Sequence, residues 1–194
     1  MDKIIVSHAD RDHIGASVPI NERLIIKEIL SGEVDRLPEE LSIKPCLSGL
    51  QWTWDDVNFT LWQWSGATKS NDASCVLMVE AKGERLLLTG DISKPAEQTW
   101  LLNNHFTIDW LLVPHHGSKH SSSINFLAMT KPHNAIISRG WLNAFHHPNE
   151  QVVNRYKALN TQLHDTAITG ALHITLGAYL PVERQRDIKY FWRK

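Results

Sequence analysis

The stretch that decides the fold is VSHADRDHIG, residues 6–15. It follows the apolar run Ile4-Ile5-Val6, which predicts a short buried strand, and Gly15 indicates that the chain then turns into a helix. Four side chains that can bind metal ions are thus expected on a tight loop at a strand end: His8, Asp10, Asp12 and His13. The alternative, a solvated polar turn, explains the whole string less well. So many ligands on so short a loop do not close easily on one ion, which favours two ions side by side.

Length and composition predict an ordinary globular protein. The chain has 194 residues, 42% hydrophobic and 21% charged, which predicts a single domain over residues 1–194 with a sizeable core. The formal net charge of −1 gives no overall attraction to nucleic acid. Any nucleic-acid binding must therefore come from a local patch.

The two cysteines, Cys46 and Cys75, lie far apart and match no zinc-binding spacing. Cys75 is in an apolar run and is expected in the core; the sequence leaves a disulfide open. We find no signal peptide and no apolar stretch long enough to span a bilayer. The chain as given is therefore expected to be soluble, and its compartment is unknown.

The order of the predicted elements favours an α/β (α+β) fold. Residues 51–54 and 57–62 alternate in polarity and predict a β-hairpin, whose tryptophans are expected to stack in the sheet rather than on nucleobases. Strands come first and then alternate with helices, which predicts two sheets covered outside by helices, an αββα sandwich. The other predictions are strands at 24–26, 74–79, 85–89, 109–113, 135–138 and 172–176, helices at 94–103, 121–130 and 148–159, and a surface connection at 31–45.

Two further motifs follow buried strands. Gly90 and Asp91 end the apolar run 86–88, where glycine permits a sharp turn that exposes the carboxylate. The run 111–113 leads into Pro114-His115-His116-Gly117-Ser118-Lys119-His120, which we interpret as a site rather than a histidine-rich surface loop.

A third motif follows the predicted strand 135–138. It contains Ser138-Arg139-Gly140, then Asn143, and then His146-His147-Pro148. The sequence does not decide between His146 and His147, or between His115 and His116, as metal ligands.

These motifs, in this order, resemble the metallo-β-lactamase superfamily. Its signature, His-x-His-x-Asp-His, matches residues 8–13 with Asp10 in place of the second histidine, a variant similar to the ComEC branch of DNA-internalisation competence proteins. His-His-Gly-Ser after Val-Pro is a feature of that branch, as are Ser-x-Gly, the asparagine loop and His-Pro. The segment at Asn71 resembles a family segment that usually carries a metal-binding histidine, and this chain has none there.

The resemblance implies two divalent ions, manganese or zinc. One ion is expected on His8, Asp10 and His115 and the other on Asp12, His13 and His147, with Asp91 as the bridge. The carboxylate of Asp10, which replaces a histidine, slightly favours manganese. The residues assigned to catalysis are Asp12, Asp91 and His116, and those assigned to substrate binding are Ser118, Lys119, Arg139 and Asn143, although ordinary loop roles explain Ser118, Lys119 and Arg139 equally well.

The implied activity is that of a phosphodiesterase or nuclease that cleaves DNA, single-stranded DNA foremost, during uptake in natural competence. Two alternatives remain: a hydrolase of a small ester, lactone or phosphodiester, and a non-catalytic remnant that binds metal or DNA. Family members have further strands before the first metal loop and a membrane-spanning competence domain attached to the bacterial inner membrane. We therefore expect a domain that lacks its first strands, with an exposed edge at residues 3–6 that favours a homodimer.

Overall fold

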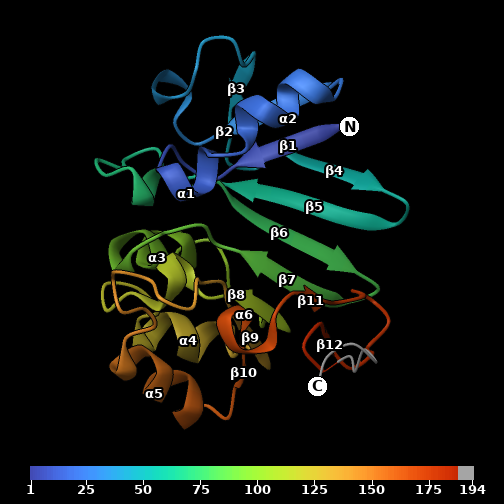
Figure 1. The fold of residues 1–194 in the computed structure, drawn as a ribbon. Helices are drawn as coiled ribbons and strands as arrows, with labels where there is room; N and C mark the ends of the chain where they lie inside the picture. The colour runs from blue at the N-terminus through green and yellow to red at the C-terminus, as the bar shows by residue number, and fades with distance from the viewer. Residues whose placement is uncertain (188–194) are drawn as a thin grey trace.

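The computed structural model describes residues 1–187. Its N-terminal part is a parallel sheet of order β1-β2-β3, drawn in blue at the top of Figure 1. Two short helices connect β1 to β2, and a 3-10 turn at Val34–Arg36 precedes β3. The elements are β1 (Lys3–Val6), α1 (Arg11–Ile14), α2 (Ser17–Arg23), β2 (Glu28–Ser31) and β3 (Ile43–Pro45).

The second sheet has seven strands in the order β10-β9-β8-β7-β6-β5-β4, and its first half along the chain is antiparallel. Asp55 and Asp56 join β4 to β5 with φ angles of 46° and 63°, and Lys82 and Gly83 join β6 to β7 with 49° and 85°. Two central residues with positive φ match the right-handed twist of the flanking strands. The hairpin predicted at 51–62 is confirmed, and the strands predicted at 74–79 and 85–89 pair as a second hairpin. The strands are β4 (Gln51–Trp54), β5 (Val57–Trp62), β6 (Val76–Ala81) and β7 (Glu84–Leu88).

The other half of this sheet, from β7 to β10, is parallel, so each connection crosses back over the sheet through a helix. Ser123 and Asn149 cap α4 and α5 by accepting hydrogen bonds from Phe126 N–H and Gln151 N–H. The elements are α3 (Lys94–Leu101), β8 (Trp110–Leu112), α4 (Ile124–Thr130), β9 (Asn134–Ile137), α5 (Glu150–Ala158), β10 (Gln162–Asp165), α6 (Thr166–Thr169), β11 (Leu172–His173) and β12 (Glu183–Arg184).

Three buried clusters define the layers. One joins the blue helices to the small sheet, and includes Val6 and Ile29 with Val18 packed against them. The second lies between the sheets, where Leu30 and Leu61 are buried beside the disulfide between Cys46 and Cys75. The third and largest lies between the seven-stranded sheet and α3, α4 and α5 (Figure 1). This order of layers confirms the αββα sandwich.

Three local predictions are corrected. The strand predicted at 24–26 is wrong: Leu24 ends α2, Ile25 is 89% exposed, and the strand is β2, whose Ile29 and Leu30 are buried. The strand predicted at 172–176 is only β11, paired with β12 outside the main sheets. The connection predicted at 31–45 contains β3. An apolar triplet alone does not fix a strand, because pairing partners decide which triplet enters the sheet.

No helix among the described residues is long and apolar enough to cross a membrane.

Candidate metal centre

The first metal loop begins where β1 ends. His8 is fully buried, and its Nδ1 lies 3.1 Å from Ser7 Oγ and 3.3 Å from Ser74 Oγ. His13 lies on α1, and its Nδ1 is 2.9 Å from the same Ser7 Oγ. The two rings are 4.2 Å apart between centroids. The Nδ1 atoms are thus engaged by hydroxyls, and the Nε2 atoms are directed elsewhere.

Both Nε2 atoms are buried and have no hydrogen-bond partner among residues 1–187. Buried polar atoms are nearly always paired, because an unpaired one costs about 1–3 kcal/mol. Ligating histidines commonly engage the second ring nitrogen in an outer hydrogen bond, which orients the ring. The two orphaned nitrogens therefore fit a metal site.

Asp91 follows β7 and faces these histidines. Its side chain is nearly buried, and its carboxylate oxygens lie 3.4 Å from His13 Nε2, 3.6 Å from His116 Nε2 and 3.8 Å from His115 Nε2. Gly90 makes this approach possible: its φ is +56°, and a Cβ there would lie 2.8 Å from Ser74. A glycine at this position is thus required by both conformation and space.

His115 and His116 follow β8 with φ angles of 51° and 54°, the left-handed region that non-glycine residues rarely adopt. This turn directs both rings towards Asp91. His116 Nδ1 lies 2.7 Å from the Ser138 carbonyl oxygen, to which it can donate, and its Nε2 lies 3.2 Å from Asp12 Oδ2. Such backbone strain is concentrated at functional sites.

Two groups of three ligands result. Within residues 1–187, the ligand atoms of each group lie within 4.8 Å of one another: His8, His13 and Asp91 in one, and Asp12, His13 and His116 in the other. His13 belongs to both groups. This differs from the predicted partition, which placed His115 and His147 on the ions and left His116 to catalysis.

Asp10 and His147, also predicted as ligands, lie at the margins of these groups. Asp10 Oδ2 is 3.5 Å from His8 Nε2, while its Oδ1 accepts a hydrogen bond from Ser70 Oγ at 3.2 Å. The His147 ring is 5.7 Å from that of His115, and His146 is exposed. The complete ligand assignment stays a prediction.

The pKa shifts of Asp91, His8, His115 and His147 favour the protonation states that bind metal. Burial raises the pKa of Asp91, but the nearby His13 and His116 rings outweigh it, and the pKa lies below its ordinary value. Burial lowers the pKa of His8, His115 and His147. Burial also lowers the pKa of His13, but Asp91 beside it reverses the shift and raises it. An ionised carboxylate beside mostly neutral imidazoles is the donor set that a divalent cation needs.

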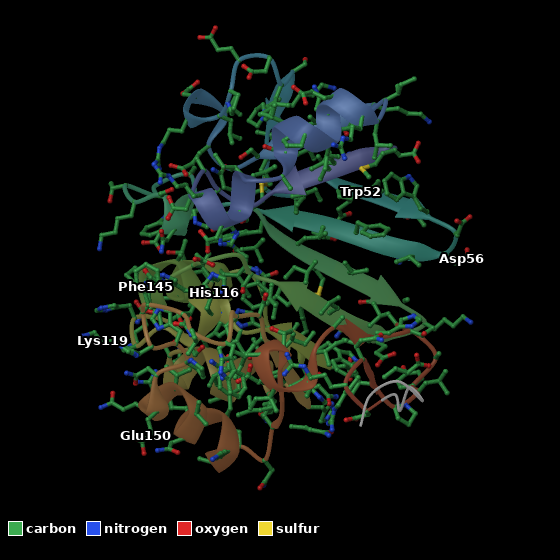
Figure 2. The ribbon with its side chains drawn as sticks, in the orientation of Figure 1. Trp52, Asp56, His116, Lys119, Phe145 and Glu150 are labelled. Carbon is green, nitrogen blue, oxygen red and sulfur yellow. A yellow bond between two sulfur atoms is a disulfide. The ribbon has the colours of Figure 1, made fainter. Side chains whose placement is uncertain are left out.

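The predicted substrate-binding residues lie in different environments. Ser118 is 3% exposed, and its Oγ accepts a hydrogen bond from His120 N–H. Arg139 is paired with Asp165 through Nε at 2.8 Å and Nη2 at 2.7 Å. Lys119 is exposed and lies at the left edge of the molecule in Figure 2. Their roles towards substrate stay predictions.

Asn143 braces the loop that carries His147. Its Oδ1 accepts from His147 N–H, and its Nδ2 donates to the His147 carbonyl, both at 2.8 Å. Gly117 permits the same loop to approach: its φ is +85°, and a Cβ there would lie 2.6 Å from Pro148. The third motif is thus held against the second.

A pocket of ≈ 630 Å³ opens beside the ligand groups. Figure 2 shows His116 below α1 and Phe145 close by, and both line this pocket. Its lining comes from the first loop, the second motif and the third: Arg11, Asp12, His116, Ser138, Arg139, Gly140, Asn143, Ala144, Phe145, His147 and Thr166.

Sequence reasoning missed several supporting residues. Ser7 orients two histidines, and Glu33 accepts hydrogen bonds from Ala9 N–H at 2.9 Å and from Ser70 Oγ. Asn71 Nδ2 lies 3.2 Å from the His115 ring nitrogens. The sequence identified the segment at Asn71 by its resemblance to the family but gave this side chain no role. Arg11 lines the pocket. Ser7 and Arg11 stand inside the first motif, whereas no local signal identifies Glu33.

The chain is similar to known proteins in sequence and in fold. The family model described as "Metallo-beta-lactamase superfamily" matches residues 1–141. Competence protein ComA of Neisseria gonorrhoeae is 34% identical over 199 residues, covering 100% of this chain and 28% of ComA. Recombination protein 2 of Haemophilus influenzae is 30% identical over 176 residues, covering 90% of this chain and 22% of the relative. The chain thus spans about a quarter of the length of these relatives.

Among solved structures, Igni18, a metallo hydrolase of Ignicoccus hospitalis, has a TM-score of 0.56 at 14% identity, with 85% of this chain and 76% of Igni18 covered. At this identity the likeness concerns the fold alone.

Proposed function

The chain belongs to the metallo-β-lactamase superfamily of metal-dependent hydrolases, and from this premise we propose that it cleaves phosphodiester bonds in DNA at a centre of two divalent ions, manganese or zinc. The observation that carries the proposal is the pair of buried Nε2 atoms of His8 and His13, which have no hydrogen-bond partner among the described residues and face Asp91 beside an open pocket. Residues 1–194 would act as one catalytic domain.

Bound ions would lower the pKa of a water molecule to about 7 and polarise a phosphoryl oxygen. The residues that would hold them are His8, His13 and Asp91, and Asp12 with His116, joined by the predicted ligands Asp10, His115 and His147. Asp91 contributes a buried negative charge that offsets the ions. When His116 Nδ1 donates to the Ser138 carbonyl, the lone pair of Nε2, which lies beside Asp12, would be available to a metal ion.

Two observations favour a phosphodiester over other esters. Arg11 lines the pocket, and its guanidinium has no ion-pair partner among residues 1–187, so it is available to a phosphate. The curated relatives are named for competence and recombination, processes that concern DNA. Both alternatives remain testable: a hydrolase of a small ester or lactone, and a metal-binding remnant without turnover.

The test combines metal analysis with a substrate panel. The purified chain is measured by elemental mass spectrometry and assayed on single-stranded DNA, duplex DNA, bis-p-nitrophenyl phosphate and p-nitrophenyl acetate, with manganese, zinc or EDTA. We expect cleavage of the phosphodiesters that depends on metal and stops in EDTA. Cleavage of the acetate alone would replace the proposal with an esterase. A metal-loaded chain that cleaves nothing would support the remnant.

A further inference from the structure

Phe145 presents an aromatic ring to solvent at the mouth of the pocket. Its side chain is 79% exposed, and its ring lies on that of His147 at 5.9 Å with an interplanar angle of 21°. The loop beneath is fixed by the two hydrogen bonds of Asn143 to His147. One face of the Phe145 ring thus packs on His147, in a loop held by hydrogen bonds, and the rest of the ring is open to a ligand.

The charges around the pocket are divided between two arginines. Asp165 neutralises Arg139 through a double contact with its guanidinium. Arg11 is distant from Arg139 in the sequence but lines the same pocket. Its guanidinium has no ion-pair partner among the described residues. The pocket therefore combines one available cation, one aromatic face and the ligand groups at Asp12 and His116.

This combination matches the chemistry of one nucleotide. A nucleobase has a flat π-face that stacks on an aromatic ring, and its phosphate carries the negative charge that arginine pairs with. The pocket volume of ≈ 630 Å³ lies within the range of small-ligand sites, about 300–1,000 Å³. In a duplex the bases are already stacked and paired, so only an unpaired strand offers the face.

We propose that Phe145 is a base-stacking platform, which takes one unpaired base of single-stranded nucleic acid while Arg11 pairs with a phosphate of the same strand. The inference rests on the proposed function and deepens it, since it defines how the strand is positioned at the metal centre. Trp141 and Leu142 are also exposed on this loop, and a lipid surface is the competing occupant. Phe145 shares its pocket with Asp12 and His116, which favours the substrate.

Binding, rather than turnover, tests the proposal. Fluorescence anisotropy would measure the affinity of the purified chain for labelled thymidine oligonucleotides with hydrolysis-resistant phosphorothioate linkages. Phe145→Ala should weaken binding about tenfold and Phe145→Trp should retain it, because base stacking tolerates any aromatic ring. Leu142→Ala is the matched control: Leu142 is 90% exposed on the same loop and does not line the pocket, and its affinity should equal wild type.

An abasic oligonucleotide of equal length separates stacking from a loss of folding. Wild type should bind it about as weakly as Phe145→Ala binds the normal strand, and Phe145→Ala should bind both strands equally. Arg11→Gln should reduce the salt dependence of log K by about 0.7, the value for one phosphate contact on a single strand.

Three results would overturn the platform: equal affinity of wild type and Phe145→Ala, equal affinity of wild type for normal and abasic strands, or an equal loss in Leu142→Ala. Loss of binding to anionic lipid vesicles in Phe145→Ala, with unchanged binding to the oligonucleotide, would assign the loop to a membrane. The binding assay needs no cleavage, so it can be interpreted even if the hydrolase proposal fails. If the chain cleaves DNA but Phe145→Ala binds the oligonucleotide as tightly as wild type, only the platform is refuted.

Discussion

The candidate metal centre takes its ligands from two parts of the molecule whose buried cores differ. The small half, residues 1–46, supplies His8, Asp10, Asp12 and His13. The large half, from β4 to α6, supplies Asp91, His115, His116 and His147. In Figure 1 the two halves meet where α1 faces the loops that follow β7 and β8.

The cores behind these ligands differ. In the large half, Asp91 follows a strand with the buried Leu87, and the helices behind the sheet bury the aromatic rings of Trp100, Phe126 and Tyr156. In the small half the buried cluster is aliphatic, and α1 is a single turn with no buried residue. We infer that the large half holds its ligands in place before metal binds, whereas the ligands of the small half become fully ordered only when metal binds.

The largest effect is expected from Asp91→Asn, which removes the carboxylate charge that is predicted to bridge the two ions and keeps the shape of the side chain. The DNA cleavage rate with manganese should fall by about a thousandfold or more. Steady-state kinetics with elemental analysis of bound metal would measure this, and a melting curve would confirm that the fold is intact. Equal activity of wild type and variant would remove Asp91 from the mechanism.

The two cores can be compared directly with one leucine from each. Leu127→Ala in the large core should lower the free energy of unfolding by about 3 kcal/mol, because it leaves a cavity in a fully buried site. Leu41→Ala in the small core should lower it less and should weaken metal binding more. Urea unfolding and metal titration of both variants would measure the pair. The opposite order would show that the small half is the firmer one.

Metal removal should distinguish the halves without mutation. Adding manganese or zinc to metal-free protein should slow amide exchange in β1 and α1, because binding to the folded state stabilises the least ordered ligands most. Exchange in β8 and β9 should hardly change. Hydrogen exchange followed by mass spectrometry checks this, with zinc-free magnesium buffer as the control. Uniform protection of both halves would contradict the division.

Acid should destabilise the metal-free protein. Burial lowers the pKa of His8, His115, His147 and His164, so the unfolded chain binds more protons than the folded one below the unfolded value of about 6.5. Their contribution to stability is present above that pH and is lost as the pH falls from it through the lower pKa values of the folded state. His13, with its raised pKa, acts in the opposite sense and partly offsets the loss.

The urea midpoint of unfolding should therefore be lower at about pH 5.5 than at about pH 7.5. His164→Asn is the control for the large half, since His164 is fully buried against Asn134 and lies away from the metal ligands; it should flatten the dependence without changing metal affinity. A midpoint that rises on acidification would show that His13 dominates.

The smallest effect concerns the open side of β1. This strand pairs with β2 on one side only within its sheet, and an unpaired edge is a template for another chain. The predicted homodimer through residues 3–6 should appear as concentration-dependent sedimentation. A monomer at every concentration would reject it, and such a result would leave the comparison of the two cores unchanged.

Much of the fold follows from local pattern. The hairpins at 51–62 and 76–88 depend on alternation and on turns with positive φ, and α4 and α5 begin at capping residues, so short-range chemistry determines them. The strand at β2 was misplaced, and β10 was not recognised, because each is a short segment whose pairing with a distant strand decides its conformation. His164 is buried in β10, where polarity alone predicts a surface.

The site shows the same division. The sequence by itself determined that His8 and Asp91 stand just after buried strands, since a polar run after such a strand emerges at a sheet edge, whereas Asp12 and His13, predicted on the same loop, lie on α1. Only the tertiary structure decided that His116 approaches Asp12, that Asp165 forms an ion pair with Arg139, and that Phe145 and Arg11 line one pocket. The physical reason is that a side chain's direction depends on backbone torsions, such as the left-handed turn at 115–116, and on partners as far as 104 residues away in sequence, neither of which residue order specifies.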